Sequence, residues 1–194
     1  MNEEYIFSEL YGKEHLVEMN NNSGVYIYGF MDEKGDKPFI LYYIGKGEIK
    51  KRLTSHIQNL LCGNSTIYKE EYLSEFYKYY KDLKKMNISN DLTGEQIYFP
   101  IGTIDSVNWF VNNYDKLRTH IEYMYKNFKF AYVEISDDYD RANLEYHLIN
   151  KIGKGKLANL SMPNHTKEYL NVKITTEDEG LLTALKKYEN LNID

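Results

Sequence analysis

The chain has 194 residues, 42% of them hydrophobic, which is enough to bury a sizeable core in one domain. Its formal net charge of −5 argues against a globally basic nucleic-acid binder, so any DNA contact must rest on a local patch. The one cysteine, Cys62, excludes an intramolecular disulfide, and no apolar run resembles a signal peptide or a membrane span. We therefore expect a cytoplasmic protein that makes no membrane contact.

Residues 1–23 are expected to form a covering helix. Their apolar side chains recur at helical spacing among acidic residues, at Ile6, Phe7, Leu10 and Tyr11. The polar run at 20–23 would end this helix.

Two strands and a helix are expected next. Residues 24–31 and 39–44 are rich in aromatic and β-branched side chains, and the polar, glycine-containing loop between them predicts a β-hairpin. Gly45-Lys46-Gly47 is expected to break the second strand. After this break, apolar residues recur at helical spacing, at Ile49, Leu53, Ile57 and Leu60.

Three nitrogen-bearing side chains are expected to converge near the start of this helix. Arg52 and His56 are four residues apart and therefore share one helix face, and Lys46 lies at the turn that leads into it. Gly45 and Gly47 have no Cβ, so a phosphate could approach the backbone closely there. The order and spacing of these residues favour a site that cleaves a phosphodiester.

These residues resemble the motif of the GIY-YIG nuclease superfamily. Its two halves stand here as Gly24-Val25-Tyr26 and Tyr43-Ile44-Gly45, and Arg52 and His56 follow where the family has its arginine and histidine. The chain departs from the family in the valine of the first half and in a longer connection between the halves. The longer hairpin loop should be tolerated, because loop-closure entropy grows slowly with length.

The resemblance implies an α+β fold with a small three-stranded, mostly antiparallel sheet flanked by helices. Residues 24–60 and 130–164 would form the catalytic core, and 61–129 a large, mainly helical insertion. Residues 165–194 lie outside the resemblance; their pattern predicts a C-terminal extension with a short strand and a last helix, which begins at the capping-box signature of Thr176. Within the insertion, residues 67–85 mix aromatic residues with lysines; the lysine face could touch DNA, but simple packing of the aromatic stripe also explains this pattern.

The resemblance also implies a metal-binding glutamate on a later helix. Residues 130–135 have the composition of a third strand, and residues 141–152 have the apolar spacing of a helix. Glu145 lies at the edge of the inward face of this helix, where a carboxylate is costly to bury unless a partner such as a metal ion compensates its charge. Glu145 is therefore the expected metal ligand, and Glu134 on the strand is the rival.

Substrate binding is expected from the remaining family residues. An asparagine beyond the glutamate is implied by the resemblance, and Asn159 fits this position, with Asn164 as the competitor. Gly45 and Lys46 are the other expected substrate contacts.

The expected mechanism uses one Mg²⁺ ion, for which Mn²⁺ can substitute, held by Glu145 and several waters. The ion would stabilise the leaving oxygen while Arg52 neutralises charge on the phosphate. Tyr26 would serve as general base for the attacking water, with Tyr43 and His56 positioning it; alternatively, His56 is itself the base. The sequence leaves both possibilities open.

The expected function is a metal-dependent endonuclease that hydrolyses DNA, such as a restriction or a phage or mobile-element nuclease. An enzyme that cuts both strands would favour a homodimer, because two-fold DNA symmetry is matched by protein symmetry. Two alternatives stay open: a catalytically silent nucleic-acid-binding or scaffold module, and a nuclease for RNA or for branched or damaged DNA.

Overall fold

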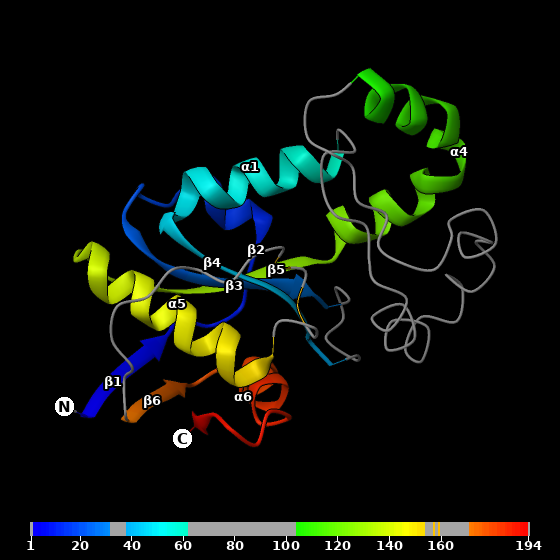
Figure 1. Cartoon of the computed structure of the whole chain (residues 1–194). Helices are drawn as coiled ribbons and strands as arrows, with labels where there is room; N and C mark the ends of the chain where they lie inside the picture. Colours follow the sequence, from blue (N-terminus) through cyan, green and yellow to red (C-terminus); the bar gives the residue numbers. More distant parts are fainter. Residues whose placement is uncertain are drawn as a thin grey trace. The chain divides into compact units, whose positions relative to one another are not determined.

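The computed structural model describes residues 2–31, 38–61, 104–153, 157, 159 and 171–193, and the fold is α+β (Figure 1). The chain, expected from its length to form one domain, divides into two compact units: Met1–Thr54 with Asn127–Asp194, and Ser55–Lys126. The second unit covers most of the expected insertion at 61–129. It contains the helix α4 (Ile104–Lys126), whereas the lysine-rich stretch at 67–85 lies outside the described residues.

An antiparallel sheet with the strand order β2-β5-β3-β4 forms the centre of the first unit. β3 (Ser23–Phe30) and β4 (Ile40–Glu48) are the strands of the expected hairpin, and β5 (Phe128–Glu134) is the expected third strand. A short edge strand, β2 (Tyr11–Gly12), makes the sheet four-stranded and not three-stranded. The break expected at Gly45-Lys46-Gly47 is wrong, because pairing with residues 24–26 keeps this stretch in β4.

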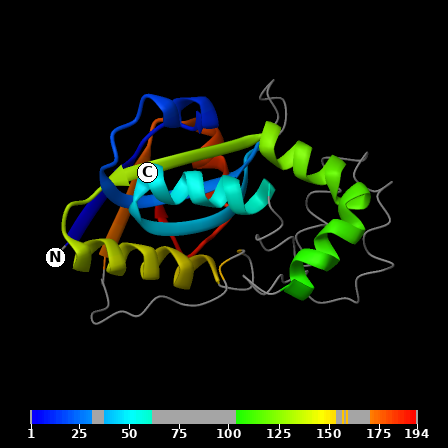
Figure 2. The same ribbon diagram turned by 90° about the horizontal axis from the view of Figure 1, so that it is seen from above.

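A second, parallel sheet joins segments from opposite ends of the chain. β1 (Asn2–Phe7) pairs with β6 (Asn171–Thr176), which pairs with β7 (Asn192–Ile193), and Figures 1 and 2 both show β1 beside β6. The covering helix expected at 1–23 is therefore wrong: the described part of this segment forms β1, β2 and the 3₁₀ helix η1 (Lys13–Val17). The partner strand of β1 is so distant in sequence that local spacing does not reveal it.

The helices expected for the catalytic core and the extension are present. α1 (Ile49–Leu61) follows β4 directly and buries Ile49 and Leu53. α5 (Asp138–Ile152) begins before the expected residue 141, because the side chain of Asp137 accepts a hydrogen bond from the backbone N–H of Asp140 at 2.9 Å and caps the helix.

The last helix, α6 (Glu179–Leu185), is capped by Asp178 and not by Thr176 as expected. Asp178 Oδ1 accepts from the backbone N–H of Leu181 at 2.8 Å, and Oδ2 accepts from Leu10 at 2.9 Å. The cap therefore also ties the C-terminal extension to the segment between β1 and β2.

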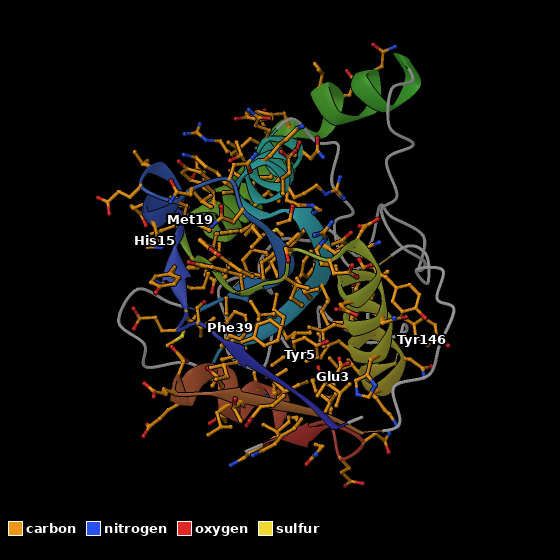
Figure 3. The ribbon with its side chains drawn as sticks, turned by 90° about the vertical axis from the view of Figure 1, so that its left-hand side faces the viewer. Glu3, Tyr5, His15, Met19, Phe39 and Tyr146 are labelled. Atoms are coloured by element: carbon orange, nitrogen blue, oxygen red, sulfur yellow. The ribbon has the colours of Figure 1, made fainter. Side chains whose placement is uncertain are left out.

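The main hydrophobic core lies between one face of the antiparallel sheet, α5 and the second sheet with α6. α5 contacts β3 and β4, and α6 contacts β4 and β6. Figure 3 labels Phe39, a member of this core, and Tyr5, which packs against the core. The C-terminal extension is thus part of the core, to which it contributes Val172, Ile174, Leu181, Ala184, Leu185 and Leu191.

Candidate functional site

Strand pairing places the two halves of the motif against each other. In the β3–β4 pair, Tyr26 lies opposite Gly45, and Tyr28 lies opposite Tyr43. Because side chains of directly paired residues point to the same face of a sheet, Tyr26, Tyr28 and Tyr43 share one face. The rings of Tyr26 and Tyr43 are stacked with centroids 6.4 Å apart, and Tyr43 also stacks on Tyr28 at 5.3 Å.

A β-bulge in β4 brings two adjacent tyrosines, Tyr42 and Tyr43, into contact with the same ring. The register shifts between Tyr28 and Gly29, so that Tyr42 is an extra residue in β4. As a result both Tyr42 and Tyr43 contact the ring of Tyr28, at centroid distances of 5.7 and 5.3 Å. The sequence showed two adjacent tyrosines but not the bulge that turns both of them toward Tyr28.

Gly45 leaves the space in which the Tyr26 ring lies. A Cβ at position 45 would stand 2.5 Å from Cζ of Tyr26 and closer still to the phenolic oxygen, a separation that real Cβ atoms essentially never show. Gly47 has a different requirement, because its φ of +123° is one that residues with a side chain rarely adopt. Gly45 thus determines where the phenol of Tyr26 can lie, and Gly47 allows the backbone conformation at the end of β4.

The N-terminal segment fixes the start of α1, which carries Arg52. The backbone N–H of Ile49 donates to the carbonyl of Asn22 at 2.9 Å, and that of Lys51 donates to Asn21 Oδ1 at 3.2 Å. Lys50 adds a hydrogen bond from Nζ to the carbonyl of Met19 at 3.0 Å. Arg52 therefore lies at the end of the first turn of a helix that is held in place at its beginning.

Arg52 connects the two phenols. It is exposed, but its guanidinium group forms side-chain hydrogen bonds with both Tyr26 and Tyr43. Its aliphatic stem runs past Gly47, where a Cβ would lie 3.5 Å from Cγ of Arg52. One planar donor group therefore bridges residues from both halves of the motif.

Both phenols are protonated at neutral pH. Burial raises the pKa of Tyr26 well above its ordinary value, and the neighbouring Tyr43 raises it further. Burial, together with the charge of Glu145, also raises the pKa of Tyr43. The charge of Arg52 and its hydrogen bonds act in the opposite direction in both cases, but the effect of burial is larger.

Glu145 approaches this group of residues from α5. Its side chain is only 8% exposed, and burial raises the pKa of its carboxyl to about 7, although the charges of Lys46 and Arg52 lower it. Lys46 lies opposite Val25, so it shares the face that packs on α5, whereas Tyr26 and Tyr43 lie on the other face. The candidate site therefore has residues on both faces of β4, the edge strand of the sheet.

A metal ion at Glu145 would take most of its ligands from water. Among the residues that the structure describes, no three His, Cys, Asp or Glu side chains gather to form a metal-binding group. A buried carboxylate with a raised pKa is nevertheless a fitting partner for Mg²⁺, because a bound cation offsets the cost of burying its charge.

Glu134, the rival ligand, lies elsewhere. It is exposed at the end of β5, opposite Gly24, and both its oxygens accept from Asn22 Nδ2, at 3.0 and 2.9 Å. The structure thus brings Glu145, and not Glu134, into electrostatic contact with Arg52 and the phenols.

The remaining predicted site residues, His56, Asn159 and Asn164, lie in different parts of the chain. His56 lies one helical turn after Arg52 on α1 and belongs to the second unit, Ser55–Lys126. Asn159 is buried, and its side-chain amide is paired with the backbone of Ile44 in β4. This pairing was not evident from the sequence, where Asn159 was expected to bind substrate; that role stays a prediction. Asn164 lies outside the described residues.

Comparison of the chain with protein-family models, curated proteins and solved structures gave no match. Of the helices in the described ranges, none has the length and apolarity needed to cross a membrane. The case for a function therefore rests on the geometry of the site and on the motif resemblance.

Proposed function

We propose that the chain is a metal-dependent endonuclease of the GIY-YIG type that hydrolyses phosphodiester bonds in DNA. The observation that carries this proposal is the meeting of Tyr26 and Tyr43 with Arg52 from α1 and Glu145 from α5. Phenols, a guanidinium group and a buried carboxylate are the groups that such a hydrolysis needs to orient water, hold the phosphate and hold a metal ion.

Arg52 and Lys46 would bind the scissile phosphate. Arg52 is exposed, so its guanidinium can meet a phosphate, and its planar donors suit phosphate oxygens. Lys46 is half-buried and lies on the opposite side of β4, next to Glu145. Both cations act on the carboxyl of Glu145 at the edge of β4, so they supply local positive charge in a chain whose net charge is −5, and local charge is what phosphate binding requires.

Glu145 would hold one Mg²⁺ ion, or Mn²⁺ in its place, with water as the remaining ligands. Such an ion supplies charge stabilisation to the leaving oxygen. Without it, the carboxyl of Glu145 is half protonated near pH 7, because burial raises its pKa to about 7.

Tyr26 and His56 compete for the role of general base. A buried phenol with a raised pKa keeps its proton at neutral pH, which disfavours Tyr26. An imidazole has a reference pKa of about 6.5, which suits the task. We therefore propose that Tyr26 and Tyr43 orient the attacking water and that another group is the base, for which the motif resemblance offers His56.

The test is cleavage of supercoiled plasmid with Mg²⁺ by the wild type, Glu145→Ala and Arg52→Ala. Glu134→Ala and Arg118→Ala are matched controls, since both replace exposed charges outside the site. We expect cutting by the wild type and both controls, and loss of cutting by the two site variants. Normal cutting by Glu145→Ala would overturn the metal-ligand assignment.

The substrate class is tested in the same assay. Branched DNA and RNA are offered beside the plasmid, and cleavage of RNA alone would overturn DNA as the substrate. Tight binding of plasmid without any cutting would instead support a silent binding module. Direct formation of linear plasmid would support a homodimer, because one site cuts one strand at a time.

A further inference from the structure

Asn159 is joined to one residue of the edge strand by two hydrogen bonds. Its Nδ2 donates to the carbonyl oxygen of Ile44 at 2.7 Å, and its Oδ1 accepts from the backbone N–H of Ile44 at 3.2 Å. Both residues are buried, with Asn159 7% exposed and Ile44 fully buried. The side-chain amide therefore pairs with β4 as a neighbouring strand would.

Each of these bonds holds a different peptide group. The N–H of Ile44 belongs to the peptide that follows Tyr43, and its carbonyl belongs to the peptide that precedes Gly45. Because a peptide group is planar, fixing both groups fixes the Cα positions of Tyr43 and Gly45. The side chain of Ile44 is itself packed in the core, so this rung of β4 is held by its backbone and its side chain.

The two residues next to Ile44 are those that meet Tyr26. Gly45 lies opposite Tyr26 and makes room for its ring, and Tyr43 stacks on the same ring. β4 is the edge strand around which the candidate site wraps, so on this side it has no neighbouring strand in the described residues. Asn159 supplies the pairing that such a strand would give.

Asn159 is in turn anchored by the core. Leu157, two residues earlier, is 1% exposed and belongs to the same hydrophobic cluster as Ile44 and Leu148 of α5. With both amide atoms used on Ile44, Asn159 has a buried structural contact where the motif resemblance implied contact with substrate.

We propose that Asn159 is a positioning residue for phosphodiester cleavage: by clamping the backbone of Ile44, it sets the placement of Tyr43 and of Tyr26 over Gly45. This inference rests on the proposed nuclease function and deepens it. It assigns Asn159 an action through β4 and no contact with substrate.

The variant Asn159→Asp tests the two hydrogen bonds to Ile44, because only the protonated form of the new carboxyl group can make both of them. As a carboxylate, Asp has only acceptors, so it cannot donate to the carbonyl of Ile44 and repels it. As a neutral acid, which burial favours, it has one O–H donor and one acceptor and restores both bonds. We expect kcat at pH 8 to fall on the order of 10- to 100-fold with little change in KM, because small misplacements of reacting groups have effects of this size.

The kcat of Asn159→Asp relative to wild type at the same pH should then recover as the pH falls to 5. Asn159→Leu has the same number and branching of side-chain heavy atoms but no polar group, so its relative kcat should stay low at every pH. Asn127→Asp is the control for placing a carboxyl at another buried asparagine, since Asn127 is 4% exposed and directly precedes β5. It should show no recovery of this kind.

Two results would overturn the proposal. One is a rise in KM with unchanged kcat in Asn159→Asp, which would indicate contact with substrate. The other is a relative kcat of Asn159→Asp that does not change between pH 8 and pH 5 while the protein stays folded by circular dichroism.

A second readout separates this proposal from the nuclease function. Amide hydrogen exchange at Ile44, followed by NMR, should be slow in the wild type and fast in Asn159→Leu. The ring signals of Tyr26 and Tyr43 in Asn159→Asp should differ from those of the wild type at pH 8 and coincide with them at pH 5, so that the titration of Glu145, which affects both proteins, cancels. If the wild type cuts no nucleic acid, the nuclease function fails; the exchange and ring signals still decide whether Asn159 positions the tyrosines.

Discussion

Gly45 lies directly opposite Tyr26 in the β3–β4 pair, and the phenol of Tyr26 occupies the space that a side chain at position 45 would need. The glycine of the second motif half thus leaves the space that the tyrosine ring of the first half needs. This relationship explains why two segments separated by a hairpin loop depend on each other.

Replacing Gly45 with alanine should displace the Tyr26 ring. The added Cβ would stand 2.5 Å from Cζ of Tyr26, so ring and backbone must separate. We expect a loss of stability of about 1–3 kcal/mol, as for other overpacked cores. Plasmid cleavage should fall on the order of 100-fold. Gly180→Ala in α6 is the control, because its Cβ would lie 3.1 Å from Asp178 Oδ1, and it should cut normally. Normal cutting by Gly45→Ala would show that the placement of Tyr26 is not needed.

Glu145→Gln should stabilise the metal-free protein above neutral pH. Burial raises the pKa of Glu145 from 4.5 to about 7, so its contribution to stability is complete below pH 4.5 and is lost as the pH rises through 7. This loss amounts to about 3 kcal/mol by pH 8. Urea unfolding in EDTA at pH 5 and pH 8 measures it. The difference in stability between wild type and Glu145→Gln should grow with pH; a constant difference would contradict the raised pKa.

Magnesium should stabilise the wild type through Glu145. A ligand that binds the folded state alone raises the melting temperature. We expect millimolar Mg²⁺ to raise Tm at pH 8 in the wild type and in Glu134→Gln, but not in Glu145→Gln. An equal shift in all three proteins would place the ion elsewhere.

His147, on the same helix as Glu145, should have the opposite pH dependence. Burial, helped by the charge of Lys151, lowers its pKa from 6.5 to about 4. Its contribution to stability is therefore present above pH 6.5 and lost as the pH falls toward 4, by about 2 kcal/mol at pH 5. His147→Gln should flatten the acid side of the stability curve. If NMR titration of His147 gave a pKa near 6.5, this prediction would fail.

Arg52→Lys should not restore the function of Arg52. An ammonium group lacks the planar fork that reaches both Tyr26 and Tyr43, so the charge is kept while the bridge is lost. We expect plasmid cleavage to fall on the order of 10- to 100-fold. Arg118→Lys, at an exposed ion pair with Glu122, is the control. Wild-type rates in Arg52→Lys would show that charge alone suffices.

Local sequence patterns predicted the elements that surround the site. The hairpin, α1, β5 and α5 were all expected, because each has a run of apolar residues with the period of its own structure. The expected helix at 1–23 failed for a physical reason. Phe7 is buried and Ile6 is 66% exposed in a strand whose partner, β6, lies at the other end of the chain, and such pairing overrides local spacing.

The sequence by itself determined which chemical groups the site contains and the order in which they occur: two tyrosines, an arginine and a glutamate. The tertiary structure alone decided their protonation and their neighbours. Burial raises the pKa of Tyr26 and Glu145, and burial depends on packing between segments far apart in the chain. The pairing of Asn159 with Ile44 is likewise a contact between distant segments, so it has no local signature in the sequence.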